Sequence, residues 1–345
     1  MHAPDGFLTV GTAAATGAIS IGAVGASLAS QAKDRLSESQ IPLAGIAAAF
    51  IFAAQMVNFP VAAGTTGHLL GGALAAILLG PAMGTLAVTV VVVVQAFGFA
   101  DGGLTALGYN VLNMAVVTSF GGYAAFRLLR RILPANGGGV VVAAGLAGGI
   151  SVVLSAAAFS LEWLFGASAP IPFDTVFGAM VGVHLLIGIG EGIITGMAVG
   201  AVLAARPDLV HGASDLDRLQ LADRPRLGLR AFALTGLAVT VVIATVVSQF
   251  AVDDPDGLER VAEDQGFISA AEEHALGSSI FADYATAGVD DEQLSLAVAG
   301  VTGVLLTLLV TGGLVLALRD RGPPRRHAGR AAADRPASTR MTRGR

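Results

Sequence analysis

Residues 139–161 read GVVVAAGLAGGISVVLSAAAFSL, with no charged side chain among them. An α-helix needs about 20 mainly apolar residues to cross the hydrocarbon core of a bilayer. The stretch is long enough for this, and it contains too many consecutive apolar residues for the surface helix of a soluble domain. It therefore predicts a transmembrane helix, over 139–163.

The rest of the chain repeats this pattern. Of its 345 residues, 54% are hydrophobic and only 13% are charged, whereas soluble domains carry about 25% charged residues. Further apolar segments are 7–30, 41–58, 69–81, 84–99, 104–126, 174–204, 230–250 and 294–318. We therefore predict an all-α polytopic membrane protein with nine spans. The segments 69–81 and 84–99 are short, and they can also be read as one broken hairpin.

Basic residues lie in alternate loops, which predicts the orientation of the chain. They are Lys33 and Arg35; Arg127, Arg130 and Arg131; Arg206, Arg218, Arg224, Arg226 and Arg230; and the arginines of 319–345. In the acidic segment 251–293, Arg260 is the only lysine or arginine. Cytoplasmic loops are enriched in Lys and Arg, so we expect the N-terminus outside and the C-terminus in the cytoplasm. Because no basic residue precedes Lys33, we expect no cleaved signal peptide and a mature chain that starts at Met1.

Several kinds of chemistry are excluded by what the sequence lacks. Without cysteine there is no disulfide and no thiolate metal site, so a metal ion must be bound by nitrogen or oxygen. The only lysine is Lys33, in Ala-Lys-Asp, which rules out a Gly-Lys-Ser/Thr phosphate-binding loop. We therefore expect no enzyme activity, and any ATP hydrolysis must come from another polypeptide.

The N-terminal sequence Met1-His2-Ala3-Pro4-Asp5-Gly6 has the donors of a chelating site. The α-amine, the next backbone amide and the imidazole of His2 can form fused five- and six-membered rings around one ion. Three such nitrogens suit Ni²⁺, Cu²⁺ or Co²⁺ and not Mg²⁺ or Ca²⁺. Taken alone, however, these residues are more often an incidental surface histidine near the start of a chain.

A second candidate is the Gly/Thr-rich segment 58–68, which ends at His68. It lies at membrane depth, where irregular backbone is tolerated only inside protein or beside a cavity. His68 can supply a fourth nitrogen. The alternative is a packed histidine that is hydrogen-bonded to a carbonyl group.

The first 205 residues resemble the cobalt/nickel substrate-binding S components of energy-coupling factor (ECF) transporters, the CbiM/NikM type. The motifs that carry the resemblance are His-x-Pro-Asp-Gly-Phe-Leu from His2, Phe52–Pro60, Gly67–Gly72, Asp101–Gly108 and Gly188–Gly192. Ala3 departs from the usual Ile or Met without affecting a ligand. The resemblance implies an S-component-like bundle of about seven spans.

The resemblance also implies a function and a metal site. The metal would be bound by four nitrogens, from the Met1 amine, the His2 amide and imidazole, and the His68 imidazole, under a lid formed by 1–6 and 58–67. The chain would be the capture subunit of an ATP-driven importer of Ni²⁺ or Co²⁺ in a prokaryotic plasma membrane. Its partners would be a transmembrane coupling (T) subunit and cytoplasmic ATPases, with no nucleic acid. Small residues of the second span, such as Ala44 and Ala48, would contact the coupling subunit.

The C-terminal third resembles a small module named after the motif PDGLE. The motif stands at Pro255-Asp256-Gly257-Leu258-Glu259, where Asp256 is also expected to cap a helix. We predict four parts: a metal-binding unit 1–205, a cytoplasmic linker 206–229, a two-span accessory module 230–318 and a disordered basic tail 319–345. The module accompanies nickel systems, so it favours nickel over cobalt.

Other polar side chains within or beside the spans have two interpretations. Gln95, Asn110 and Asn113 can orient His68 or the N-terminal segment, and Asn58, Thr65 and Thr66 can belong to the lid. The more common role of such groups is to join helices by hydrogen bonds, and this reading also applies to His184 and Glu191.

Three other functions are compatible with the sequence. A self-sufficient secondary carrier needs charged groups at mid-membrane, where only His184 and Glu191 qualify. An intramembrane metalloenzyme needs a general base beside the metal, and Asp5 is the only carboxylate close in sequence. A scaffold or sensor would not transport at all. Dependence of metal uptake on separate ATPase subunits distinguishes an importer subunit from all three.

Overall fold

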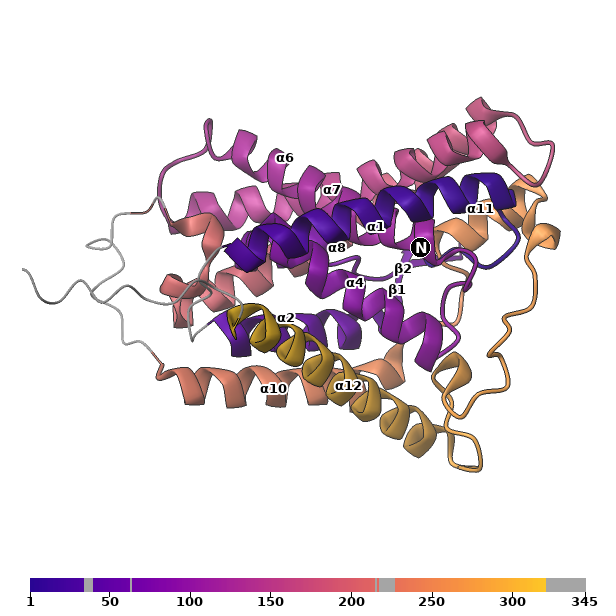
Figure 1. Ribbon diagram of the computed structural model, residues 1–345. Helices are drawn as coiled ribbons and strands as arrows, with labels where there is room; N and C mark the ends of the chain where they lie inside the picture. The colour runs from indigo at the N-terminus through magenta and orange to yellow at the C-terminus, as the bar shows by residue number, and fades with distance from the viewer. Residues whose placement is uncertain (34–39, 63, 215, 217–226, 321–345) are drawn as a thin grey trace, which may run out of the picture.

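The computed structural model describes residues 1–33, 40–62, 64–214, 216 and 227–320. Residues 215 and 217–226 of the predicted linker and nearly all of the predicted basic tail (321–345) lie outside these residues. The described chain is a bundle of long helices that run roughly side by side (Figure 1).

Six helices in the described residues are long and apolar enough to cross a membrane, which confirms the all-α polytopic class. They are α1 (Val10–Lys33), α4 (Pro81–Gly98), α7 (Gly137–Gly166), α8 (Phe173–Ala205), α10 (Leu229–Thr245, extended by the short turn η4, Val247–Phe250) and α12 (Glu292–Asp320). The apolar helix α2 (Gln40–Gln55) is shorter. Each of these corresponds to a predicted span.

The predicted span 104–126 is one continuous helix whose middle is underwound. It consists of α5 (Leu107–Asn110), the π-helical stretch η1 (Val111–Gly121) and α6 (Gly122–Leu129). The residues at both junctions keep helical backbone angles, with φ near −60°. π-Helical turns are rare and are frequent at functional sites. Here the turn follows Asn110 and contains Asn113.

The predicted span 69–81 is not a complete helix. Only α3 (Gly72–Leu79) is helical, and all eight of its residues are buried. At 1.5 Å per residue it is about 12 Å long, less than half the thickness of the hydrocarbon core. Residues 68–71 before it are not helical, and Gly71 (φ 80°) and Gly80 (φ 87°) turn the chain at its two ends. The segment is therefore discontinuous because non-helical backbone is stabilised at its start.

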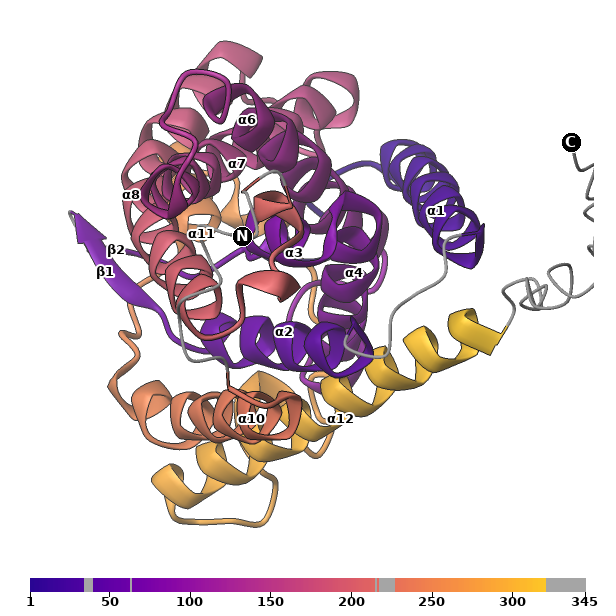
Figure 2. The same cartoon turned by 90° about the vertical axis from the view of Figure 1, so that its left-hand side faces the viewer.

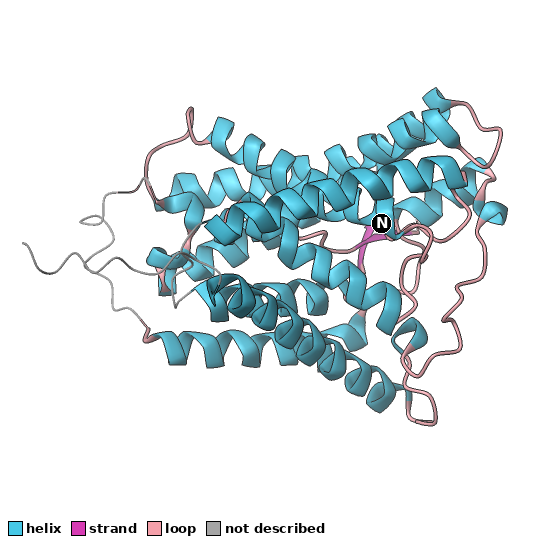
Figure 3. Cartoon of the chain, viewed as in Figure 1, coloured by secondary structure: helices cyan, strands magenta, loops and turns pink. Residues whose placement is uncertain are grey.

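The two described strands form a hairpin at the edge of the bundle. β1 (Phe59–Ala62) pairs antiparallel with β2 (Thr65–Gly67), with Phe59 opposite Gly67. Figure 2 shows the hairpin projecting from the bundle, while Figure 3 shows its base beside the N-terminus. The described residues of the expected lid, 58–62 and 64–67, therefore lie in or next to this hairpin, whose base is beside the N-terminus.

The two ends of the bundle differ in composition. The N-terminus and the loop 251–291 with α11 (Gly257–Gln265) lie at one end (Figure 1). The opposite end contains the C-terminal ends of α1, α6 and α8 and the start of α10. Of the described basic residues, Lys33, Arg130 and Arg206 are at that second end. Three of the loops that contain basic residues therefore lie at the same end of the bundle.

The small-residue face of α2 is covered by the chain itself. Helix α2 packs against α12, α10 and α4, and Ala44, Ala48, Ala49 and Ala53 are fully buried. The expectation that this face contacts a coupling subunit is therefore wrong. The C-terminal pair α10 and α12 already occupies it.

Candidate metal centre

The N-terminal segment is anchored in the bundle by the turn at Asp5. The Asp5 carboxylate accepts hydrogen bonds from the backbone N–H groups of Leu104, Thr105 and Ala106, at 2.6–3.2 Å. These groups precede α5 and have no helical partners, so the carboxylate satisfies them. Gly6 follows with φ 92°, and a Cβ there would lie 2.2 Å from the Ala270 carbonyl oxygen. The sequence Asp-Gly is therefore required to make this turn.

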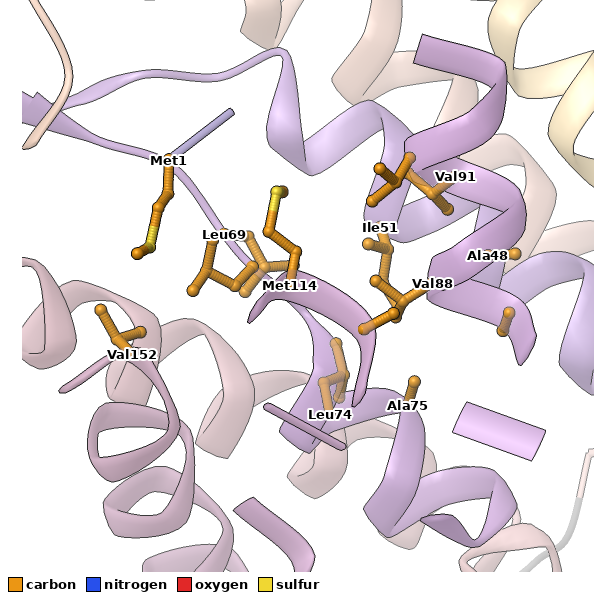
Figure 4. Packing of buried hydrophobic residues seen from close by; sticks show 14 of the residues in the cluster. Met1, Ala48, Ile51, Leu69, Leu74, Ala75, Val88, Val91, Met114 and Val152 are labelled. Carbon is orange, nitrogen blue, oxygen red and sulfur yellow. The ribbon is translucent and has the colours of Figure 1, made fainter. Parts of the chain in front are cut away.

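Residues 1–4 are held by contacts along their length. The Asn110 side chain accepts from the Ala3 N–H at 2.9 Å and donates to the Ala3 carbonyl at 3.0 Å. The Tyr109 hydroxyl donates to the Pro4 carbonyl at 3.0 Å. The Met1 side chain is buried beside Leu69 and Val152 (Figure 4). Residues 1–4 are thus fixed against the bundle, with Met1 and Ala3 buried.

This packing brings the Met1 amine next to His68. The amine nitrogen lies 2.6 Å from His68 Nε2. His68 Nδ1 lies 3.1 Å from the Leu69 carbonyl oxygen, which accepts only if Nδ1 carries the proton. The lone pair of Nε2 therefore faces the amine, so both nitrogens are directed at the same point.

The backbone that carries His68 is stabilised by two polar side chains. The Glu191 carboxylate of α8 accepts from Leu70 N–H at 2.6 Å and from Gly71 N–H at 3.0 Å. The Gln55 amide of α2 donates to the Leu70 carbonyl at 3.0 Å. Backbone groups at membrane depth need internal partners, so these contacts permit the break before α3.

The His2 imidazole stacks on that of His68, with ring centroids 5.2 Å apart and planes 21° apart. Its Nε2 lies 3.0 Å from Gln95 Oε1, and its Nδ1 lies 3.3 Å from Asp101. Both contacts are with acceptor oxygens, so a neutral ring donates to only one of them. The tautomer in which Nε2–H donates to Gln95 has its lone pair on Nδ1, the nitrogen that closes a six-membered chelate ring with the His2 amide. Burial, partly offset by Asp101, lowers the pKa of His2 from 6.5 to about 4. The ring is therefore neutral and able to bind a metal across the neutral pH range.

The structure adds two residues that sequence reasoning missed. The Tyr284 hydroxyl donates to Asp101 at 2.6 Å and accepts from the Gln95 amide at 3.1 Å, which orients both partners of His2. Tyr284 has φ 59°, a conformation that few residues other than glycine adopt. In the sequence, Asp101 stood out only as the first residue of an Asp-Gly-Gly motif. No motif or spacing indicated that Tyr284 belongs to the site.

The third residue that was missed as part of the site is Asp256. Its carboxylate pairs with the Met1 amine and lies 3.6 Å from His68 Nε2. Burial alone would raise the pKa of Asp256, but the terminal ammonium and His68 lower it well below its usual value. The sequence indicated only its helix-capping role.

The other predicted residues lie around this centre. Asn113 donates to Glu162 at 2.8 Å rather than to His68 or the N-terminal segment. The Thr66 hydroxyl donates to the Asp254 carbonyl at 2.8 Å, and the Asn58 carbonyl accepts from Val252 N–H at 3.1 Å. Thr65 is buried in β2. The hairpin therefore binds the segment 252–256 and makes no direct contact of this kind with the metal-ligand candidates.

An open vestibule of about 840 Å³ connects the centre to the outside of the bundle end. His2 and His68 are among its lining residues. The described lining contains no lysine or arginine and seven carboxylate residues: Asp101, Asp253, Asp254, Asp256, Glu259, Asp283 and Glu292. A cleft lined by one sign of charge concentrates counter-ions. The vestibule is therefore suited to attract cations toward the two histidines.

Comparison with known protein families identifies the family to which the chain belongs. Residues 2–209 match the CbiM family, described as the cobalt uptake substrate-specific transmembrane region. The chain belongs to this family. Residues 230–320 match the PDGLE domain. A CbiM-family chain of this kind is a multi-pass membrane transport protein.

Individual relatives agree with the family assignment. The chain is 32% identical to the fused nickel transport protein NikMN of Rhodobacter capsulatus, over 92% of this chain and 98% of that protein. It is 35% identical to the cobalt transport protein CbiM of Sorangium cellulosum, over 64% of this chain and 96% of the relative. A crystal structure of a truncated transition metal transporter superposes with a TM-score of 0.52 at 31% identity, covering 59% of this chain and 98% of that one.

Proposed function

We propose that this CbiM-family chain is the metal-capture subunit of an ATP-driven ECF-type importer of Ni²⁺ or Co²⁺. The ligands are the Met1 amine, the His2 amide and Nδ1, and His68 Nε2. The observation that carries the proposal is the 2.6 Å approach of the amine to His68 Nε2, beneath the stacked ring of His2. Residues 67 positions apart in the chain thus present nitrogen donors to one point.

The donors suit these two cations. Imidazole, amine and deprotonated amide nitrogens favour later first-row transition metals, whereas Mg²⁺ and Ca²⁺ require oxygen. Within the described residues, the His2 backbone N–H makes no hydrogen bond, so its nitrogen is available to lose a proton to a metal. The relatives above include both nickel and cobalt transport proteins. The PDGLE module, which the nickel relative shares in its fused length, favours nickel.

Two of the three alternative functions, the secondary carrier and the metalloenzyme, are less well supported by the contacts. Both oxygens of Glu191 are engaged by backbone N–H groups, so Glu191 is not available as the coupling group of a secondary carrier. Asp5 is engaged by the residues before α5, so it is not available as the general base of a metalloenzyme. Each group serves instead to position His68 or the N-terminal segment.

Energy coupling must then come from partners. The chain has no phosphate-binding loop lysine, so we propose a transmembrane T subunit and paired cytoplasmic ATPases. Cells that express this chain with such subunits should accumulate Ni²⁺ or Co²⁺. Replacing the phosphate-binding lysine of the ATPase should reduce accumulation to background, while metal binding by the purified chain stays unchanged. Accumulation that persists without ATPase activity would favour a secondary carrier.

We further propose a prokaryotic plasma membrane location with the N-terminus outside and the C-terminus in the cytoplasm. Because the chain has no native cysteine, single cysteines report their own accessibility. Ser269→Cys, in the acidic outer loop, is expected to react with a membrane-impermeant maleimide in intact cells. Ser338→Cys, in the Arg-rich tail, is expected to react only after lysis. The opposite pattern would reverse the topology.

A further inference from the structure

The PDGLE motif lies inside the candidate metal centre, although it belongs to the C-terminal module. The Thr66 N–H donates to the Pro255 carbonyl at 3.0 Å, and Thr66 and Asp256 form a parallel β-bridge. The segment 254–256 therefore continues the small sheet alongside β2, two residues before His68. Addition of a strand to a sheet edge aligns the added backbone in a defined register, and here the register places Asp256 beside the Met1 amine.

The two oxygens of Asp256 make different contacts. Oδ1 accepts from Leu258 N–H at 2.8 Å and Glu259 N–H at 3.0 Å, which caps α11. Oδ2 contacts the Met1 amine and lies 3.6 Å from His68 Nε2. Capping a helix requires only one oxygen. The capping role of Asp256 therefore does not explain why its Oδ2 contacts the Met1 amine.

The depth at which Asp256 lies depends on Gly257. A Cβ at residue 257 would lie 2.5 Å from Ile187 Cδ1 and 3.0 Å from His184 Cε1. Only glycine lets the turn approach α8 this closely. The Asp256 side chain is consequently only 14% exposed. A buried carboxylate is costly unless it is paired, and the amine supplies the opposite charge.

We propose that Asp256 is a positioning residue of the metal site: it holds the terminal amine beside His68 before the metal arrives, so that the fused C-terminal module completes the site of the N-terminal unit. This inference rests on the proposed function. The C-terminal module would then take a direct structural part in metal capture. The ligand that Asp256 positions is a chain terminus, which is poorly ordered unless other groups hold it in place. Without Asp256 the amine must be ordered at the expense of binding free energy.

Asp256→Asn tests the charge without removing the cap, because asparagine caps helices about as well as aspartate. Ni²⁺ affinity is measured on the purified full-length chain by competition with a chelator. We expect the substitution to weaken binding about 10- to 100-fold, the usual effect of removing a group that orients a metal ligand. At saturating Ni²⁺ the visible absorption spectrum should match that of the wild type, because all four nitrogens remain.

Glu263→Gln is the matched control, since it removes the same charge from an exposed position on α11. It should bind Ni²⁺ within about twofold of the wild type, and thermal unfolding of both metal-free variants should match the wild type. Unchanged or tighter binding by Asp256→Asn would overturn the proposal, as would an equal loss in Glu263→Gln. An altered spectrum would make Asp256 a ligand rather than a positioning residue. Failure of the wild type itself to bind Ni²⁺ or Co²⁺ would instead contradict the proposed function.

Discussion

Replacing His68 with alanine is expected to abolish high-affinity binding of Ni²⁺ and Co²⁺. The loss should exceed 100-fold, because removing a group that merely orients a ligand already costs about 10- to 100-fold. His68 Nε2 lies 2.6 Å from the terminal amine, and the only other side chain of the described residues recorded against this amine is Asp256. The measurement is metal content and affinity of the purified, detergent-solubilised variant. His2→Ala should have an effect of similar size.

His274→Ala is the control for this prediction. His274 lies in the outer loop, where its Nδ1 accepts from Leu276 N–H at 3.0 Å, and it does not line the vestibule. This variant should bind metal as the wild type does. If His68→Ala still retains stoichiometric nickel or cobalt after dialysis, the proposed ligand set is incorrect.

Extending the chain before Met1 is expected to have an equally large effect while leaving every side chain in place. An added residue converts the amine into an amide, which removes one nitrogen donor and the positive charge that pairs with Asp256. Met1 is only 5% exposed, so an added residue also has little space beside it. Metal affinity should fall by more than 100-fold, as for the loss of a histidine ligand.

A cleavable extension provides its own control. Proteolytic removal that regenerates Met1 as the first residue should restore binding, and the same tag placed after Arg345 should have no effect. Tight binding by the uncleaved N-terminally extended protein would exclude the amine as a ligand. The same experiment would then favour a site made only of side chains, such as His2, His68 and Asp256.

The positions of the spans were predictable from the sequence because hydropathy is a local property. Stretches such as 139–161 must be covered by lipid or by protein whatever their partners are. The alternation of basic loops predicted that basic residues gather on one side, and the described Lys33, Arg130 and Arg206 lie at one end of the bundle. The motifs around His2 and His68 indicated nitrogen ligands, because the chemistry of an amine, an amide and an imidazole belongs to those residues themselves.

Only the tertiary structure decided which distant groups meet. Residue 1 and Asp256 are 255 positions apart, and no local pattern connects them. The break before α3 likewise depends on Glu191, which supplies partners to Leu70 and Gly71 from another helix. The small residues of α2 looked like a surface for a partner until α10 and α12 were seen to cover them. Composition and spacing therefore determined that this chain crosses the membrane and which nitrogens are its candidate metal ligands. Packing decided how those nitrogens are held, because hydrogen bonds and close contacts depend on distance in space and not on separation along the chain.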